Sequence, residues 1–475
     1  MRRMPRRTLR FEAGDTFQLP PLRGRALPQR VYTETFYDTA GARLGRAGFV
    51  LRRRVENGKG VWRLSVKCDG VSTLDAEAPG GPAGPPEELR ELVSAASAGF
   101  ELAPTAQVRT RSTGLRVKDG SRSLARITVA SIALLDGRRA TRSFHEIELE
   151  RLAAGQKELA ALESALRKAG AKKTNDAGPL ELALAGEPRP ELSLPTSSLE
   201  LLRPYLREQY ARMLAHDPGV RVGNDPEDLH QLRVATRRLR SVLRTARPIL
   251  DRAWVDEMRS ELAWLAGELG PTRDLDVLIP HLLEEARDLE PADRKALAPL
   301  FEKLEASRAD ARGRALEALR SERYLALLAG IDAAAAGPPA GEDGSLRAEA
   351  RKEFKKLRRA MRAVDEAPTE EAIHRARIKG KRARYATELL EDELGRPAGK
   401  LLSAAKGFQN VAGEHQDAVV AEARIRSLLR GVRSQRRALV AGMLVGRQRE
   451  RRRAAAEALP KAWRRYEDAA EKVWA

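Results

Sequence analysis

Up to about Leu184, hydrophobic and polar residues alternate with a period of two, in short segments that end in turn residues. This alternation is typical of strands with one buried face, and the Asn-Gly and Asp-Gly endings are typical of hairpins. Two segments, Pro82 to Gly99 and Gln156 to Ala169, have a helical pattern instead. The region therefore predicts an antiparallel barrel or sandwich, with strands at residues 30–40, 48–58, 60–70, 106–120, 123–137 and 142–152.

After Thr196 the period becomes that of helices, in long segments rich in Ala, Leu, Arg and Glu. The stretch GEPRPELSLPT between the two regions is rich in proline and indicates a linker. We therefore predict an α+β multidomain chain. It consists of an antiparallel β-barrel domain at residues 1–186, a linker at 187–195 and an all-α domain at 196–475.

The helical region contains a repeat. The segment DLHQLRVATRRLR, which contains His230, resembles AIHRARIKGKRAR, which contains His374, 144 positions later (374 − 230). Downstream, LGPTRD and AGEHQD lie 143 positions apart (417 − 274). Two elements that recur at nearly the same offset indicate a tandem duplication. A repeat of this length predicts two pseudo-symmetric helical bundles, at about residues 196–335 and 345–475, rather than a solenoid.

Cationic side chains form a stripe on each of the two repeated helices. They step by three or four positions, which places them on one helical face: His230, Arg233, Arg237, Arg240 and Arg244. The second copy has His374, Arg377, Lys381 and Arg384, flanked by Lys379, Arg382 and Tyr385. Like charges at these spacings destabilise an isolated helix by about a few tenths of a kcal/mol per pair. The stripes therefore favour a bound polyanion over the alternative, a solvated face neutralised by carboxylates of other helices.

The composition is that of a folded, basic protein. Hydrophobic residues make up 42% and charged residues 32% of the chain, and 87 Lys and Arg against 67 Asp and Glu give a net charge of +20. Such a charge predicts a polyanionic partner. Cys68 is the only cysteine, which excludes an intramolecular disulfide and fits a reducing compartment. Neither a signal peptide nor an apolar stretch of roughly 18 residues is found, so we expect a cytoplasmic protein without a membrane partner.

Nucleic acid and inorganic polyphosphate both match this charge. Proteins that bind single strands line a basic groove with aromatic rings, but aromatic residues make up 4% of the chain and the stripes contain one, Tyr385. Arginine matches phosphate oxygens in pairs, so a base-free phosphate chain is the first choice and nucleic acid the second. His230 and His374 lie among arginines that repel a metal ion, whereas at His415, which lies between two carboxylates, a metal stays an alternative.

The second half of the chain resembles a CHAD domain, a duplicated helical domain known as a polyphosphate-binding module. The resemblance rests on four motifs in order, HQLRVATRRLRSVLR, LGPTRDLDVL, HRARIKGKRARYATELL and AGEHQDAVVA. It implies polyphosphate binding without a cofactor, and makes recruitment to polyphosphate granules an expectation. The predicted binding residues are His230, Arg233, Arg237, Arg238, Arg240, Arg244, Arg273, His374, Arg377, Lys379, Lys381, Arg382, Arg384, Tyr385 and His415.

The first half resembles a CYTH domain, the triphosphate tunnel fold, in which an antiparallel β-barrel holds a triphosphate and binds metal on acidic residues. The motif YTETFYDTAGARLGRAGFVLRRR is close to the family's early strands, and WRLSVK, VRTR and EIELE follow in order. The resemblance places a metal, Mg or Mn, on Glu146 and Glu148. Residues two apart share a strand face, so the predicted anion-binding residues of the tunnel are Arg52, Arg54, Arg63, Lys67, Arg109 and Arg111.

The first strand departs from this family. CYTH enzymes open with a Glu-x-Glu-x-Lys strand that helps to bind the metal, but the matching stretch RRTLRF has Arg6, Thr8 and Arg10 at these positions. Arginine repels a divalent cation, so we expect half of the metal ligands to be lost. We therefore predict a polyphosphate-binding protein whose tunnel binds an anion but hydrolyses it poorly or not at all. The alternatives are a Mg- or Mn-dependent triphosphatase or polyphosphatase, and a nucleic-acid binder.

Overall fold

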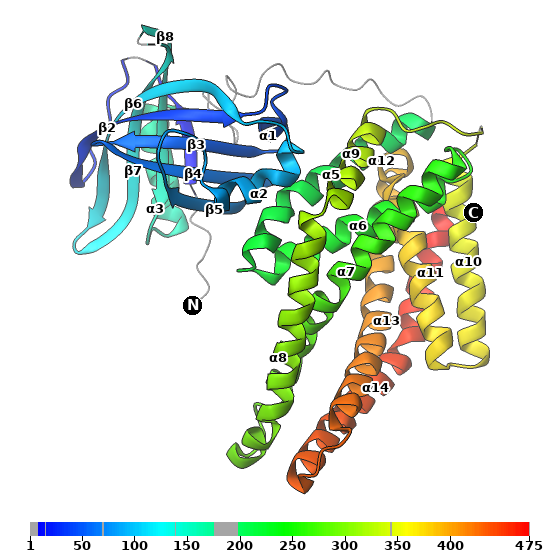
Figure 1. Cartoon of the computed structure of the whole chain (residues 1–475). Helices are drawn as coiled ribbons and strands as arrows, with labels where there is room; N and C mark the ends of the chain where they lie inside the picture. Colours follow the sequence, from blue (N-terminus) through cyan, green and yellow to red (C-terminus); the bar gives the residue numbers. More distant parts are fainter. Residues whose placement is uncertain are drawn as a thin grey trace. The chain divides into compact units, whose positions relative to one another are not determined.

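The computed structural model describes residues 8–14, 16–68, 71–137, 139–174, 198–342 and 344–474. The chain divides into two compact units, Met1–Glu191 and Leu192–Ala475. The first contains an antiparallel sheet and the second is helical, which confirms the predicted fold class (Figure 1). The predicted linker at residues 187–195 lies outside the described residues. In the ranges that are described, no helix is both long and apolar enough to cross a membrane.

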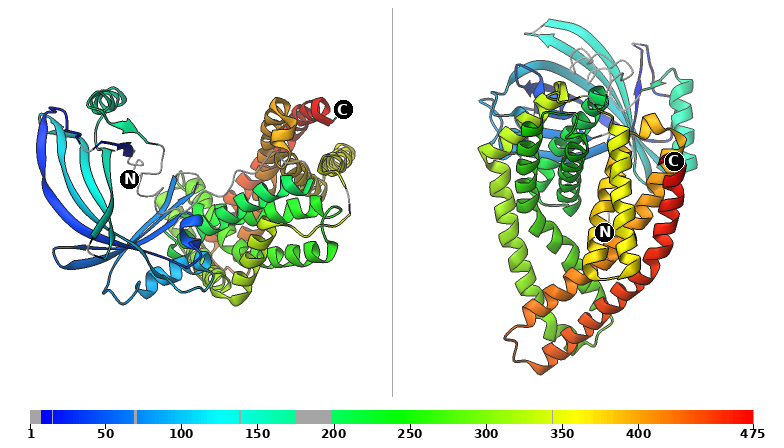
Figure 2. Two further views of the ribbon diagram at one scale, coloured as in Figure 1. Left: turned by 90° about the horizontal axis from the view of Figure 1, so that it is seen from above. Right: turned by 90° about the vertical axis from the view of Figure 1, so that its right-hand side faces the viewer.

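Nine strands of the first unit form one strongly curved antiparallel sheet in the order β5-β4-β3-β2-β6-β7-β8-β1-β9 (Figure 2). No ladder joins β5 to β9 among the described residues, so closure of the sheet into a barrel stays a prediction. The strands are β1 (Thr8–Glu12), β2 (Gly24–Asp38), β3 (Phe49–Glu56), β4 (Lys59–Cys68), β5 (Val71–Pro79), β6 (Ala103–Asp119), β7 (Arg122–Asp136), β8 (Arg139–Arg151) and β9 (Lys172–Lys173).

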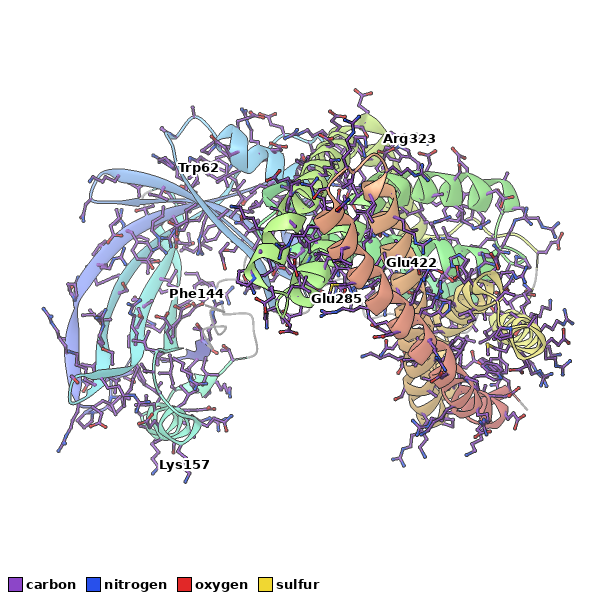
Figure 3. The ribbon with its side chains drawn as sticks, turned by 90° about the horizontal axis from the view of Figure 1, so that it is seen from below. Trp62, Phe144, Lys157, Glu285, Arg323 and Glu422 are labelled. Atoms are coloured by element: carbon purple, nitrogen blue, oxygen red, sulfur yellow. The ribbon has the colours of Figure 1, made fainter. Side chains whose placement is uncertain are left out.

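Short helices cover parts of this sheet. They are α1 (Arg43–Arg46), α2 (Glu87–Ser97) and α3 (Gln156–Lys168). Leu159 and Leu162 of α3 belong to one hydrophobic core with Phe11 of β1 and Ile147 of β8. Trp62 of β4, labelled in Figure 3, is fully buried and its Nε1 donates a hydrogen bond to a backbone carbonyl at 3.1 Å. Because strand side chains alternate, the neighbours of the buried residues in β1 and β8 point to the other face of the sheet.

The second unit contains two sets of four helices that pack in the same order. In the first set α5 packs on α6, α6 on α7 and α7 on α8; in the second, α10 packs on α11, α11 on α13 and α13 on α14. The sets join where α6 packs on α10 and α11 and where α8 packs on α14. The bounds are α5 (Ser198–Val222), α6 (Pro226–Ala246), α7 (Arg252–Glu285), α8 (Pro291–Arg320), α9 (Glu322–Ala336), α10 (Leu346–Glu366), α11 (Glu370–Glu388), α12 (Glu391–Leu394), α13 (Arg396–Leu429) and α14 (Gln435–Trp474).

Local sequence explains how α6 and α11 present their basic faces. The Asp225 side chain caps α6 by accepting the N–H of Glu227 at 2.8 Å, and Thr369 caps α11 in the same way. Leu232 and Leu239 of α6 are buried, at 0% and 1% exposure. The apolar stripe therefore faces the core, and the cations on the other side of the helix stay partly accessible.

Candidate functional site

Cationic side chains of the two repeats meet between α6 and α11. Arg237 of α6 lies close to Arg377 and Lys381 of α11, and Arg233 also lies close to Lys381. We call these four residues the central cluster. Arg377 follows Arg233, and Lys381 follows Arg237, by the repeat offset of 144 positions (377 − 233, 381 − 237). The packing of the two repeats thus gathers cations that the sequence places on separate helices.

Carboxylates neutralise the central cluster only in part. Arg233 Nη2 lies 3.8 Å from the carboxylate of Asp274 on α7. Asp417 of α13 faces Arg377 and Lys381. Two nitrogens, Arg233 Nη1 and Arg377 Nε, are buried without a hydrogen-bond partner among the described residues. A buried donor without a partner costs about 1–3 kcal/mol, so phosphate oxygens would supply acceptors that the protein does not.

Lys381 has an unusual pKa. Burial, with the nearby charges of Arg377 and Arg237, lowers the pKa of Lys381 to about 7, and Asp417 opposes this shift only in part. The ammonium group is therefore about half protonated near neutral pH. An anion bound at the central cluster would favour its charged form.

Tyr385, the one aromatic residue of the stripes, contacts Arg237 of the central cluster. Its side chain is 3% exposed, and its hydroxyl accepts a hydrogen bond from Arg237 Nε at 2.7 Å. The Arg237 guanidinium also lies 5.7 Å from the centre of the ring. The ring therefore holds Arg237 in place and is covered on the side where a base would stack.

The histidines of the repeated motifs have different surroundings. His230 lies beside Arg273, and burial together with this charge lowers the pKa of its imidazole. His374 Nδ1 donates a hydrogen bond to the side chain of Gln416. His415 is 4% exposed, so it lies mostly inside the protein, and its contact with polyphosphate stays a prediction. The neighbouring residue Gln416 reaches His374, and one residue along an α-helix is a rotation of about 100°, which turns His415 into the core.

A second group of cations lies beside the central cluster. Arg382 of α11 lies near Arg240 and Arg244 of α6 and near Arg259 of α7, and burial, together with these neighbouring charges, lowers the pKa of Arg382. Lys379 lies near Arg382 and Arg244. We call these five residues the outer cluster. Arg259 was absent from the predicted set because it belongs to neither repeated motif.

Arg238 and Arg384 are held differently, because they share one carboxylate. Glu388 lies 3.3 Å from Arg238 Nε and 2.8 Å from Arg384 Nε, and its side chain is 12% exposed. These three residues line a pocket of about 410 Å³ together with Tyr205 and Lys406. Glu388 was not among the predicted residues, although it lies four positions beyond the last arginine of the second stripe.

The basic helix α14 shows what a neutralised arginine-rich surface is like in this protein. Arg449 lies 3.0 Å from Glu422 of α13, which is labelled in Figure 3, and Arg451 lies 2.6 Å from Glu414. Of the central and outer clusters, by contrast, only Arg233 and Arg259 form an ion pair within the part of the chain that the structure describes.

In the first unit, a cavity of about 610 Å³ lies against the sheet. Phe36, Phe49 and Ile132 provide part of its lining. The cations in its wall come from five strands and are Arg10, Arg30, Arg52, Arg54, Arg63, Lys67 and Arg126. Four of the six predicted tunnel residues, those of β3 and β4, therefore lie together in one cavity, which we call the sheet cavity.

The prediction for Arg109 and Arg111 is wrong. Both are exposed, and the residues of β6 that line the sheet cavity are Thr110 and Ser112. A period of two shows that Arg109 and Arg111 share a face, but it does not show which face is inside.

Arginine side chains lie next to two carboxylates of β8. Strand β1 pairs with β8 so that Arg10 lies opposite Glu148, with Arg10 Nε 3.4 Å from the carboxylate. Arg126 of β7 lies 3.2 Å from Glu150. Glu146 also lines the cavity, but the described residues contain no group of three His, Cys, Asp or Glu side chains suited to a metal. The residues present therefore do not fit a divalent ion at Glu148. Arg6 lies outside the described residues.

The other two carboxylates of the sheet cavity are also engaged. Glu34 is 4% exposed and lies 2.9 Å from Arg54 and 3.3 Å from Arg52. Asp38 accepts the backbone N–H groups of Leu44 and Gly45 in α1, both at 2.9 Å. These carboxylates hold arginines and a helix in place, which leaves the cavity with an excess of positive charge.

Part of the helical unit matches a known family model. Residues 204–426 match the family model described as CHAD domain, which confirms the resemblance of the second half of the chain. Two uncharacterized proteins of Mycobacterium tuberculosis, MT2285 and Rv2226, are each 28% identical to the chain over 428 residues. The matches cover 83% of this chain and 81% of each relative.

Three solved structures are similar to parts of the chain. PptA from Streptomyces chartreusis is 26% identical (TM-score 0.48), over 57% of this chain and 100% of PptA. The CHAD domain from the plant Ricinus communis is 26% identical (TM-score 0.44), over 58% of this chain and 98% of that domain. HpAC1 from Hippeastrum, described as having a dominant triphosphatase activity, is 18% identical (TM-score 0.28), over 38% of this chain and 97% of HpAC1.

Proposed function

We propose that the chain binds inorganic polyphosphate on the central and outer clusters of its CHAD domain, without a cofactor, and is recruited through it to polyphosphate granules. The observation that carries this proposal is the meeting of four cations from two helices, two of which have a guanidinium nitrogen without an acceptor among the described residues. Phosphate oxygens are matched acceptors for arginine. The CHAD family match agrees with this ligand.

Nucleic acid is the second choice of ligand. Binding of a single strand relies on stacking of bases on aromatic rings, and Tyr385 is covered. Neither the central nor the outer cluster contains an aromatic residue. The site thus offers charge and hydrogen bonds without a surface for bases.

A competition experiment tests the choice of ligand. With the full chain bound to a fluorescent single-stranded DNA at fixed salt, long-chain polyphosphate should displace the DNA at an equal concentration of phosphate groups. Unlabelled DNA should not displace labelled polyphosphate under the same conditions. The reverse order of displacement would favour the nucleic-acid alternative, and no binding of polyphosphate at all would exclude the proposed function.

A second candidate function concerns the sheet cavity, for which we infer binding of a short phosphate anion without efficient hydrolysis. The salt bridge between Arg10 and Glu148 supports this inference, because a guanidinium beside the carboxylate repels a divalent ion. Metal-assisted hydrolysis depends on carboxylates that hold the ion against the phosphate.

Accordingly, the full chain should release phosphate from tripolyphosphate at close to the rate of a protein-free control, with either Mg²⁺ or Mn²⁺. A malachite-green assay measures this release, and a parallel reaction with EDTA should give the same low rate. Robust metal-dependent release that the Glu148→Gln variant abolishes would contradict the inference and establish the hydrolase alternative.

A further inference from the structure

The two repeats differ in charge at one equivalent position of their basic stripes. At the offset of 144 positions, Arg240 corresponds to Arg384 (384 − 240), whereas Arg244 corresponds to Glu388 (388 − 244). The first stripe therefore continues in arginine, and the second ends in a carboxylate. If the repeats were alike in charge, both ends of the basic surface would be open to an anion.

The surroundings of Arg244 remain positive. Arg382 lies near Arg240 and Arg244, and no ion pair joins any of these three to a carboxylate in the described ranges. The nearby acid, Glu353 of α10, already forms an ion pair with Lys356 at 2.5 Å. A phosphate chain leaving the central cluster on this side would meet further unpaired guanidinium groups.

The equivalent surroundings of Glu388 are different. The counterpart of Arg382 in the first repeat is Arg238 (382 − 238 = 144), and Glu388 lies 3.3 Å from Arg238 and 2.8 Å from Arg384. The carboxylate thus forms an ion pair with both arginines and offsets part of their charge. The pocket of about 410 Å³ at this place has room for an anion, so charge rather than space opposes one there.

We propose that Glu388 ends the polyphosphate path on one side, so that a bound chain runs from the central cluster over the outer cluster only. This inference rests on the proposed polyphosphate binding. It makes Glu388 a residue that sets how many phosphates the protein covers. It also predicts a preference for chains long enough to reach from the central cluster to Arg244.

The test compares two variants of the full chain, Glu388→Gln and Arg244→Gln, with polyphosphates of defined length. For a long chain, Glu388→Gln should tighten binding by about fivefold, the effect of one partly screened charge, and should increase the number of phosphates covered per protein. Arg244→Gln should weaken long-chain binding by about fivefold. Glu388→Gln should bind tripolyphosphate with nearly unchanged affinity, because a longer path does not help a short anion.

The outcomes separate this inference from the proposed function. Absence of polyphosphate binding by the unmodified chain would exclude both. If the unmodified chain binds but Glu388→Gln changes neither long-chain affinity nor the number of phosphates covered, only the one-sided path is wrong. Thermal unfolding shows whether the loss of the carboxylate destabilises the fold. If Glu388→Gln does not fold, the Arg244→Gln variant still tests the inference. An equal loss of affinity of Arg244→Gln for long and short chains would overturn it.

Discussion

The double variant Arg237→Ala with Lys381→Ala should bind long-chain polyphosphate at least about 100-fold more weakly than the unmodified protein. Hydrogen bonds to charged groups contribute about 1.5–3 kcal/mol each, and these residues are equivalent members of the two repeats that meet in the central cluster. Isothermal titration calorimetry at fixed salt measures the change. Arg237 also donates a hydrogen bond to the Tyr385 hydroxyl, so the thermal stability of the double variant should be measured as well.

The matched control is Arg359→Ala with Arg362→Ala. Both arginines are exposed on α10 and outside the two clusters, so this control removes at least as much positive charge from the same unit. We expect it to change polyphosphate affinity by less than about threefold, because exposed charges at a distance are screened by salt. Equal losses in the two double variants would mean that diffuse charge, and not the central cluster, binds the anion.

Polyphosphate affinity should rise about tenfold when the pH falls from 8.5 to 6. The pKa of Lys381 is about 7 in the free protein, so the side chain is mostly neutral at the higher pH and charged at the lower. Binding of an anion raises this pKa, and binding is therefore coupled to proton uptake. The expected factor corresponds to one charged hydrogen bond gained. His230, whose pKa is lowered below its ordinary value, would contribute only at more acidic pH.

Replacing Lys381 with arginine tests the assignment of this pH dependence. Lys381→Arg keeps a charge at all of these pH values, so its affinity should vary little between pH 6 and 8.5. Lys355→Arg, at an exposed position of α10, is the control and should keep the full dependence. A Lys381→Arg variant with the same pH dependence as the unmodified protein would assign the titration to another group.

The basic faces of α6 and α11 could be predicted because helical periodicity is a local property. Steps of three and four positions place Arg233 and Arg237 on one face whatever the rest of the chain does. The repeat offset similarly predicts that Arg377 and Lys381 form a second such face. That the two faces pack together, with Asp274 beside them, depends on contacts between residues far apart in the sequence.

In the sheet, the local sequence pattern does not predict which face of a strand lies inside. Alternation along β6 correctly predicts that Arg109 and Arg111 share a face, but the pairing of whole strands decides which face is inside. The pairing of Arg10 with Glu148 likewise follows from the register between β1 and β8. In the sequence, Arg10 takes the position of the lysine in the first strand of CYTH enzymes. Its position against a carboxylate appears only in the sheet.

By itself, the sequence determined the change from strands to helices, the tandem duplication and the residues that make up each basic stripe, since periodicity and offset depend only on the order of the residues. The tertiary structure decided which cations meet, the burial of His415, the low pKa of Lys381 and the neutralisation of Arg238 and Arg384 by Glu388. The physical reason is that charge interactions depend on distance and burial, and packing between distant segments sets both.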